Sequence, residues 1–175
     1  YTADFATRQG FTIKTAAQSS VVLVFSNGAT VNLGPDSELN IEQFMQDEWG
    51  SAIDVAALTE EPSSSTTKLR LARGELVGNV KKLHTQQGSS FEVNTPVGAA
   101  GIRGTVFRVT FRADPVDPRR VFFSVATLEG LVMVNLSGSA QLPTGVAADQ
   151  LVNLHLDVDV NDTTGEITLR NLPAA

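Results

Sequence analysis

Short runs of β-branched and aromatic residues, separated by Gly, Asn, Pro and Ser, recur along most of this 175-residue chain. Such runs predict strands joined by turns, because branched side chains pack well on a pleated surface and the intervening residue types favour turns. The strongest predicted strands are residues 21–25, 29–33, 69–71, 75–80, 91–93, 105–111, 121–128 and 131–136. We therefore expect an all-β fold with little helix, either β-solenoid-like or a double-layered β-sandwich of short strands.

The segment 152–160 is the clearest single strand. Apolar and polar residues alternate along it, which places one face toward a core and the other toward solvent. A turn at 162–166 leads into a further short strand at 167–169, so we predict that residues 145–175 form a C-terminal β-hairpin packed on the same core. The apolar positions are Val152, Leu154, Leu156, Val158 and Val160.

Turn residues divide the rest of the chain. Asn27-Gly28 and Glu129-Gly130 tolerate the positive φ angles of tight hairpin turns. Residues 42–67 are polar and end in a Ser/Thr-rich stretch, which predicts an insertion or long loop. The prolines in 114–120 deny backbone donors to a sheet, so that segment is expected at a hairpin tip or a loose connection.

Length and composition limit the classes of protein to consider. The chain is long enough for one domain spanning 1–175 with its own core. It contains no cysteine, which removes disulfides, thiolate metal sites and cysteine nucleophiles. A formal net charge of −6 argues against a nucleic-acid partner, because a negative field repels phosphate. No apolar run is long enough for a membrane helix, and the first residues lack the features of an export signal.

Candidate catalytic and metal-binding patterns are weak. Gly98-x-x-Gly101-x-x-Gly104 lacks the Lys-Ser/Thr ending of a phosphate loop and is flanked by predicted strands. Glu60-Glu61 lies in a predicted polar loop, where nothing would tune a carboxyl for acid catalysis. His84 and His155 have no His or Cys at metal spacing and are read as surface residues. We therefore expect no enzyme activity, no cofactor and no metal.

Three blocks of sequence carry a family resemblance. The first is the strand-turn-strand opening at 21–39, and the third is 125–134 around Glu129-Gly130. The most specific is 69–76 followed by 91–107, in which a strand leads to Thr95-Pro96 and then to Arg103-Gly104-Thr105. Together these blocks, over residues 10–136, resemble the FecR domain family, named after the ferric citrate regulator of bacterial envelopes.

This resemblance implies a non-catalytic, extracytoplasmic module of signal transduction. It implies a periplasmic or extracellular location, with the export signal removed, a protein partner in the cell envelope, no cofactor, and a membrane tether, if any, outside this sequence. The sequence has neither the helical segment that would hold a sigma factor nor a membrane helix, so the sigma-factor role and the oligomeric state stay open.

The residues that carry the match are expected to be mainly structural. Pro96 restricts φ, while Gly98 and Gly104 let the backbone turn or approach its neighbours closely. Two alternatives remain for Arg103: an internal guanidinium bonded to loop carbonyls, or an exposed one that binds a partner's carboxylate. The full set is Thr95, Pro96, Gly98, Arg103, Gly104, Thr105 and Gly130.

The alternative function is carbohydrate or cell-wall binding, or a structural role in the envelope. Sheets of all-β proteins often present flat polar faces on which an aromatic side chain can support a sugar. Trp49, within the predicted insertion, is the candidate ligand platform.

Overall fold

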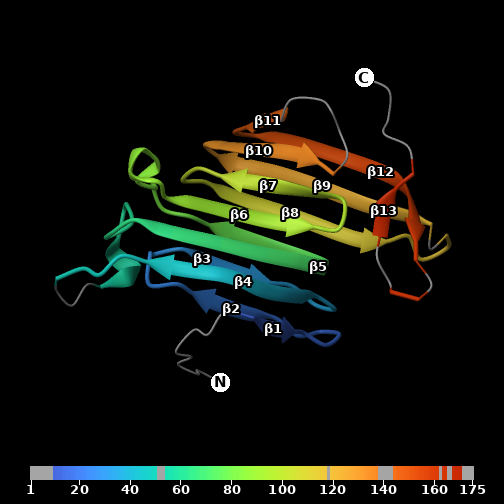
Figure 1. Cartoon of the computed structure of the whole chain (residues 1–175), viewed down its shortest axis with the longest axis horizontal. Coiled ribbons are helices and arrows are strands. Elements are labelled where there is room, and N and C mark those ends of the chain that lie inside the picture. Colours follow the sequence, from blue (N-terminus) through green and yellow to red (C-terminus); the bar gives the residue numbers. More distant parts are fainter. Residues whose placement is uncertain are drawn as a thin grey trace.

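The computed structural model describes residues 10–50, 54–117, 119–137, 144–161, 163–164 and 167–170. Strands dominate this part of the chain, and its two helical segments are short 3-10 turns, so the all-β prediction is confirmed (Figure 1). The strands are β1 (Phe11–Lys14), β2 (Val21–Val24), β3 (Thr30–Leu33), β4 (Glu38–Gln46), β5 (Ser65–Asn79), β6 (Ser90–Thr95), β7 (Gly98–Ile102), β8 (Val106–Ala113), β9 (Arg120–Glu129), β10 (Leu131–Leu136), β11 (Thr144–Ala147), β12 (Gln150–Val160) and β13 (Ile167–Leu169), and the 3-10 turns are η1 (Val55–Ala57) and η2 (Thr85–Gln87).

The strands form two layers that share β5. Layer one has the order β1-β4-β5-β6-β7-β10-β11, and layer two has the order β2-β3-β5-β8-β9-β12-β13. The β5–β6 pair is parallel, whereas the other named strand pairs are antiparallel. The arrangement combines the two predicted alternatives, because the layers stack as in a sandwich while the chain passes between them as in a solenoid (Figure 1).

Strand β5 folds back on itself at Gly74. Its first part pairs with β4 and its last part with β3 and β8. A straight strand of 15 residues would span roughly 50 Å. Glu61 nevertheless bonds both to Ser65 at the start of β5 and to Lys82, three residues after its end. The chain therefore reverses within β5 and crosses from layer one to layer two.

The crossing at Gly74 is closed by Ser37. Gly74 has φ +102°, and a Cβ at this position would lie 2.0 Å from Ser37 Oγ. The same Oγ accepts a hydrogen bond from the Glu75 N–H at 3.1 Å, and the Gly34 N–H donates to the Glu75 carbonyl at 2.9 Å. Residues 34–37 form the preceding crossing, from β3 of layer two to β4 of layer one. The crossing at Gly74 thus stacks directly on it, with no room for a side chain between the two.

The core lies between the two layers. Phe91 of β6 and Phe107 of β8 are buried, and their ring centroids lie 6.3 Å apart in an edge-on arrangement. Phe25 and Phe44 make a similar contact, with centroids 5.2 Å apart, nearer the β2 side. Aromatic pairs of this kind add about 0.5–1.5 kcal/mol beyond their apolar burial. The layers are therefore joined by packing as well as by β5.

Three local predictions are corrected by the structure. Gly98, for which a turn or a close approach was expected, lies in strand β7 and not in a turn, and there it approaches the backbone of β10 closely. Glu129-Gly130 does not form a hairpin turn, since β9 pairs with β8 and β12 while β10 pairs with β7 and β11. The irregular segment predicted at 42–67 is shorter, because β4 continues to Gln46 and β5 begins at Ser65.

A buried carboxylate holds this shorter segment. Glu61 is 1% exposed and not in a solvated loop as expected. It accepts hydrogen bonds from Ser65 Oγ and the His84 N–H, both at 2.6 Å. Asn27 Nδ2 in turn donates to Ser65 Oγ at 3.1 Å. Buried carboxylates need such partners, so this network ties the excursion to the β2–β3 connection and to the start of β5.

The segment 114–120 forms the tip between β8 and β9. Asp114 Oδ1 accepts hydrogen bonds from the N–H groups of Val116 at 2.8 Å and Asp117 at 3.1 Å. These backbone donors hold the pKa of Asp114 below its usual value, because they favour the charged carboxylate. Residue 118 lies outside the described residues.

The C-terminal strands complete layer two. Leu156 and Val158 of β12 are buried, whereas Val160 is 41% exposed, so the alternating pattern of 152–160 describes most of the strand. β12 pairs with β9 and then with β13, and Arg170 Nε donates to Asp159 Oδ1 at 2.8 Å. Of the predicted turn 162–166, residues 162, 165 and 166 lie outside the described residues, as do 171–175.

Replacing Gly74 by alanine tests the crossing within β5. We expect Gly74→Ala to lower the free energy of unfolding by roughly 2–4 kcal/mol, because it adds a Cβ at positive φ and against Ser37. Gly101→Ala is the matched control, since the nearest atom to its Cβ would be 3.8 Å away. Urea denaturation of both variants measures the difference. Equal stability of the two would contradict the proposed geometry.

Candidate functional site at the ends of strand β7

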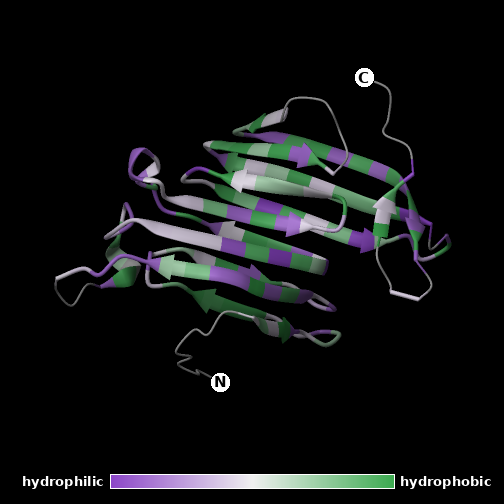
Figure 2. Cartoon of the chain, viewed as in Figure 1, coloured by the Kyte–Doolittle hydropathy of each residue, from purple (hydrophilic) through white to green (hydrophobic). Residues whose placement is uncertain are grey.

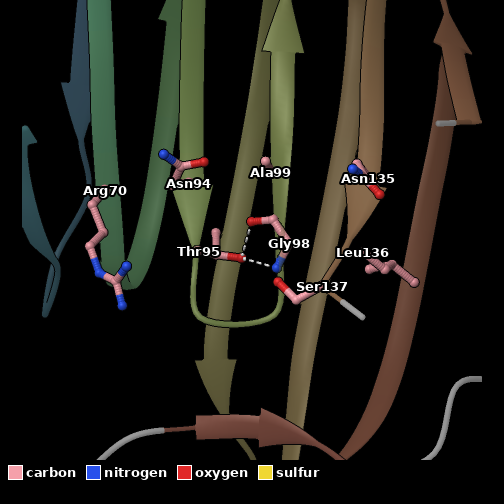
Figure 3. A pocket seen from close by; sticks show the side chains of 8 residues that line it. All are labelled: Arg70, Asn94, Thr95, Gly98, Ala99, Asn135, Leu136 and Ser137. Atoms are coloured by element: carbon pink, nitrogen blue, oxygen red, sulfur yellow. Dashed lines mark hydrogen bonds between the residues drawn. The ribbon is translucent and has the colours of Figure 1, made fainter. Parts of the chain in front are cut away.

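The Thr95–Gly98 turn joins β6 to β7 with only Pro96 and Val97 between the strands. Neither residue has positive φ, so the turn is not of the mirror-image type that short hairpins usually use. Instead, Thr95 Oγ1 accepts from the Gly98 N–H at 3.2 Å and donates to the Gly98 carbonyl at 2.8 Å (Figure 3). Thr95 is 6% exposed, so its hydroxyl is a structural part of the turn.

Gly98 is required by the neighbouring strand. A Cβ on Gly98 would lie 2.6 Å from the Asn135 carbonyl oxygen of β10. Beyond the strand, the Ser137 N–H donates to the Val97 carbonyl at 2.9 Å and extends the ladder around the turn. The close approach of three chain segments explains the residue types at this turn.

A shallow groove of about 350 Å³ opens beside this turn on the outer face of layer one. Arg70 of β5 stands on one side, Leu136 and Ser137 on the other, and Gly98 and Ala99 lie between them (Figure 3). The strand register places three polar side chains and one alanine in a row across four strands. The row is Arg70, Asn94, Ala99 and Asn135.

Glu42 orients the polar side chains of the groove. Arg70 Nη1 lies 4.0 Å from Glu42 Oε1, and Asn94 Nδ2 donates to Glu42 Oε2 at 3.2 Å. The Arg70 side chain remains 50% exposed, so an ion pair at this distance contributes little to stability. The guanidinium and the carboxamides of Asn94 and Asn135 can therefore present hydrogen-bond donors and acceptors to a ligand.

At its other end, β7 leads to the crossing into layer two. Gly104 has φ +64°, and a Cβ there would lie 3.1 Å from the Cα of Lys82. A Cβ on Gly130, at the return crossing from β9 to β10, would lie 2.6 Å from Thr105 Cγ2. Thr105 itself is buried. Residues from the second and third blocks of the family resemblance therefore meet at this end of the molecule, together with Lys82.

Arg103 is exposed at this crossing. Within the described ranges its guanidinium makes no hydrogen bond or ion pair, so the internal alternative, with the side chain held by loop carbonyls, is not what the structure shows. Lys81 and Lys82 follow β5 at the same end, beside Gly104. The crossing thus carries positive charge on a chain whose net charge is −6.

The other candidate residues lie apart from both ends of β7. Trp49 is 36% exposed in the loop after β4, and it lines neither the groove at Arg70 nor the smaller one beside Met45 and Gln87. His155 is exposed and lies on Phe122, with ring centroids 5.2 Å apart. His84 is half-buried beside Glu61, so only His155 fits the expected surface position.

The described part of the chain contains no group of three or more His, Cys, Asp or Glu side chains placed to hold a metal ion. None of the described helices is long and apolar enough to span a membrane.

Sequence reasoning did not identify Arg70, Asn94 and Asn135 as one site. They come from strands far apart in the sequence, and only the register of β5, β6, β7 and β10 brings them together. The alternation of exposed and buried residues within each strand is a usable signal, but it does not specify which strands pair.

Removing the Thr95 hydroxyl tests the turn. Thr95→Val should lower the free energy of unfolding by about 1–2 kcal/mol, because the Gly98 backbone groups lose their side-chain partner in a buried place. Thr95→Ser keeps the hydroxyl and should recover at least half of that loss. Chemical denaturation measures both, and a valine variant as stable as the serine variant would exclude a role for the hydroxyl.

Gly104→Val tests the crossing beside Arg103. A Cβ at positive φ against Lys82 should cost roughly 1–3 kcal/mol of stability, seen as a lower melting temperature. Gly88→Val is the control, since Gly88 has φ +92° but nothing within 4 Å of its Cβ position. An equal loss in both variants would show that backbone strain alone, and not the close contact, matters at Gly104.

Comparison with solved structures shows a shared fold. Two crystal structures of a protein from Parabacteroides distasonis ATCC 8503, described as a "putative anti-sigma factor", each align with a TM-score of 0.55 and 17% sequence identity. The alignment covers 92% of this chain and 59% of the other, so this chain spans well under two thirds of the length of those neighbours.

Comparison of sequences identifies the family. No curated protein sequence matches the chain. The family model described as "FecR protein" matches residues 11–133, which include both ends of β7 and the crossings at Gly104 and Gly130. The match covers well over half of the chain, and the predicted resemblance is confirmed: this chain belongs to the FecR family.

Proposed function

We propose that this chain is a non-catalytic, extracytoplasmic module that binds a protein partner in the cell envelope and takes part in signal sensing. Membership in the FecR family supports a signalling or regulatory role. The observation that carries the proposal is the polar groove between Arg70 and Asn135, which is open and lies on the outer face of layer one. A periplasmic or extracellular location is part of the same proposal.

The chemistry of the groove suits a polypeptide ligand. A carboxamide carries both a donor and an acceptor, as a peptide group does, so Asn94 and Asn135 can pair with main-chain groups of a partner. Ala99 places only a methyl group between Asn94 and Asn135, which leaves room for a partner's backbone across β7. The Arg70 guanidinium can accept a carboxylate of the partner in the forked geometry that arginine favours.

The same groove is poorly suited to catalysis. Its lining residues include no carboxylate, histidine or lysine. The nearby Glu42 is already engaged by Arg70 and Asn94. General acid–base catalysis needs a titratable group within hydrogen-bond reach of the ligand. A binding role therefore accounts for the groove better than an enzymatic one.

Two arginine variants test whether layer one carries the binding face. Arg70→Ala removes a charge from the groove, whereas Arg108→Ala removes the same charge from an exposed position on β8 in layer two. Loss of a charge-assisted hydrogen bond typically weakens binding by roughly tenfold or more. We expect chemical cross-linking to native envelope extracts to lose its main adducts with Arg70→Ala and to keep them with Arg108→Ala.

Both variants should keep the wild-type melting temperature, so that loss of adducts reports on binding and not on folding. Identical adducts from Arg70→Ala and wild type would contradict the groove as the binding face. Equal loss from both variants would point to general charge effects instead.

Carbohydrate or cell-wall binding remains the competing proposal. Its candidate platform, Trp49, does not line the polar groove. A glycan array probed with wild type and Trp49→Ala separates the two proposals. Binding of a glycan that disappears in Trp49→Ala would favour the sugar-binding function over the protein-binding one.

A further inference from the structure

Strand β2 forms an open edge of layer two. In the described part of the chain it pairs only with β3. Val22 and Val24 are 60% and 64% exposed, although both are large and apolar. Figure 2 shows β2 as an apolar strand at the lower margin of the molecule, where Figure 1 labels it.

The hydrogen-bond pattern determines which backbone groups face this edge. The Phe25 N–H donates to the Ala29 carbonyl at 2.9 Å, and on the other side of β3 the Gly34 N–H donates to Glu75. Hydrogen-bonded and non-bonded positions alternate along an antiparallel pair. Leu23 therefore bonds to Val31, whereas the N–H and C=O groups of Val22 and Val24 point away from β3.

The other sheet edges in the described chain carry features that discourage pairing. β1 ends in Lys14, which forms an ion pair with Glu38 at 3.1 Å. β11 includes Gly145, which weakens a strand, and β13 has only three residues. Natural edge strands are blunted by charge, shortness or covering elements. The four residues of β2 are Val-Val-Leu-Val, without charge, proline or glycine.

We propose that the β2 edge binds the β2 edge of a second copy of this chain in an antiparallel, two-fold symmetric pair centred on Leu23. In this register Val22 of each copy lies opposite Val24 of the other. These two pairs use all four outward-facing backbone groups of each strand. The inference is independent of the groove at Arg70, which lies on the opposite layer.

The chemistry of the edge selects a second copy as occupant. An added strand meets exposed valines on the outer face, and on the inner face it meets Val21 and Leu23, which are half-buried against the core. It must therefore be apolar on both faces, and β2 itself meets this requirement. The contact is uncharged, so it adds no like-charge pair to the repulsion between two chains of net charge −6.

A cysteine at the symmetry axis gives the first test. The native chain has no cysteine, so any disulfide in Leu23→Cys must join two copies. Residues that face each other in a non-hydrogen-bonded antiparallel pair have Cα atoms about 4.5 Å apart, within the range for a disulfide. We expect a covalent dimer to form under mild oxidation at least tenfold faster than in Leu128→Cys, where the native side chain is 57% exposed.

Leu23 is less exposed than Leu128. If the disulfides formed only by random collision between copies, Leu128→Cys would therefore form the covalent dimer faster than Leu23→Cys. A rate for Leu23→Cys equal to or below that of Leu128→Cys would overturn the proposal.

Paired charges give the second test. V22K/V24K places lysine opposite lysine twice in the proposed register, whereas V22E/V24K places glutamate opposite lysine twice. Sedimentation velocity over a concentration series should show that the first variant is monomeric, while the second associates at least as strongly as wild type. A wild type that stays monomeric throughout, or dimers that persist in V22K/V24K, would overturn the proposal.

Discussion

The fold depends on the places where the chain crosses from one layer to the other with no room for a side chain. At Gly74 the crossing is packed on Ser37, and at Gly104 it is packed on the backbone of Lys82. Both glycines have positive φ, which residues with a Cβ adopt only at a cost. These contacts stack successive crossings, and the two layers then enclose Phe91, Phe107 and the other core residues.

The same constraint positions the surfaces available for binding. Because β7 runs between a tight turn at Thr95 and a crossing at Gly104, its two ends present different chemistry. One end opens onto a polar groove lined by Arg70, Asn94 and Asn135, and the other exposes Arg103 near Lys82. Thr95, Gly98, Gly104 and Gly130 thus take part in turns and close contacts, while Arg70 and Asn135 are exposed on the outer face beside the turn.

Two open margins of the layers also differ from each other in charge and in covering strands. At one margin β12 is followed by β13, and Arg170 bonds to Asp159 across that pair. The Arg170 hydrogen bond holds the pKa of the Asp159 carboxylate below its usual value. At the other margin β2 has neither charge nor a covering strand among the described residues. The proposed polar binding face and the proposed apolar edge would let one module combine partner binding with self-association.

The sequence by itself determined the all-β class, most strand positions and the family, because two-residue alternation, turn residues and the Thr95-Pro96 and Arg103-Gly104-Thr105 blocks are local signals. It misread β7 as a turn and Glu129-Gly130 as a hairpin, since glycine favours both turns and close packing. Only the tertiary structure decided that β5 reverses at Gly74, that Glu61 is buried, and that Arg70, Asn94 and Asn135 form one row. These features depend on which strands pair and in which register, and pairing is set by contacts between residues distant in the sequence.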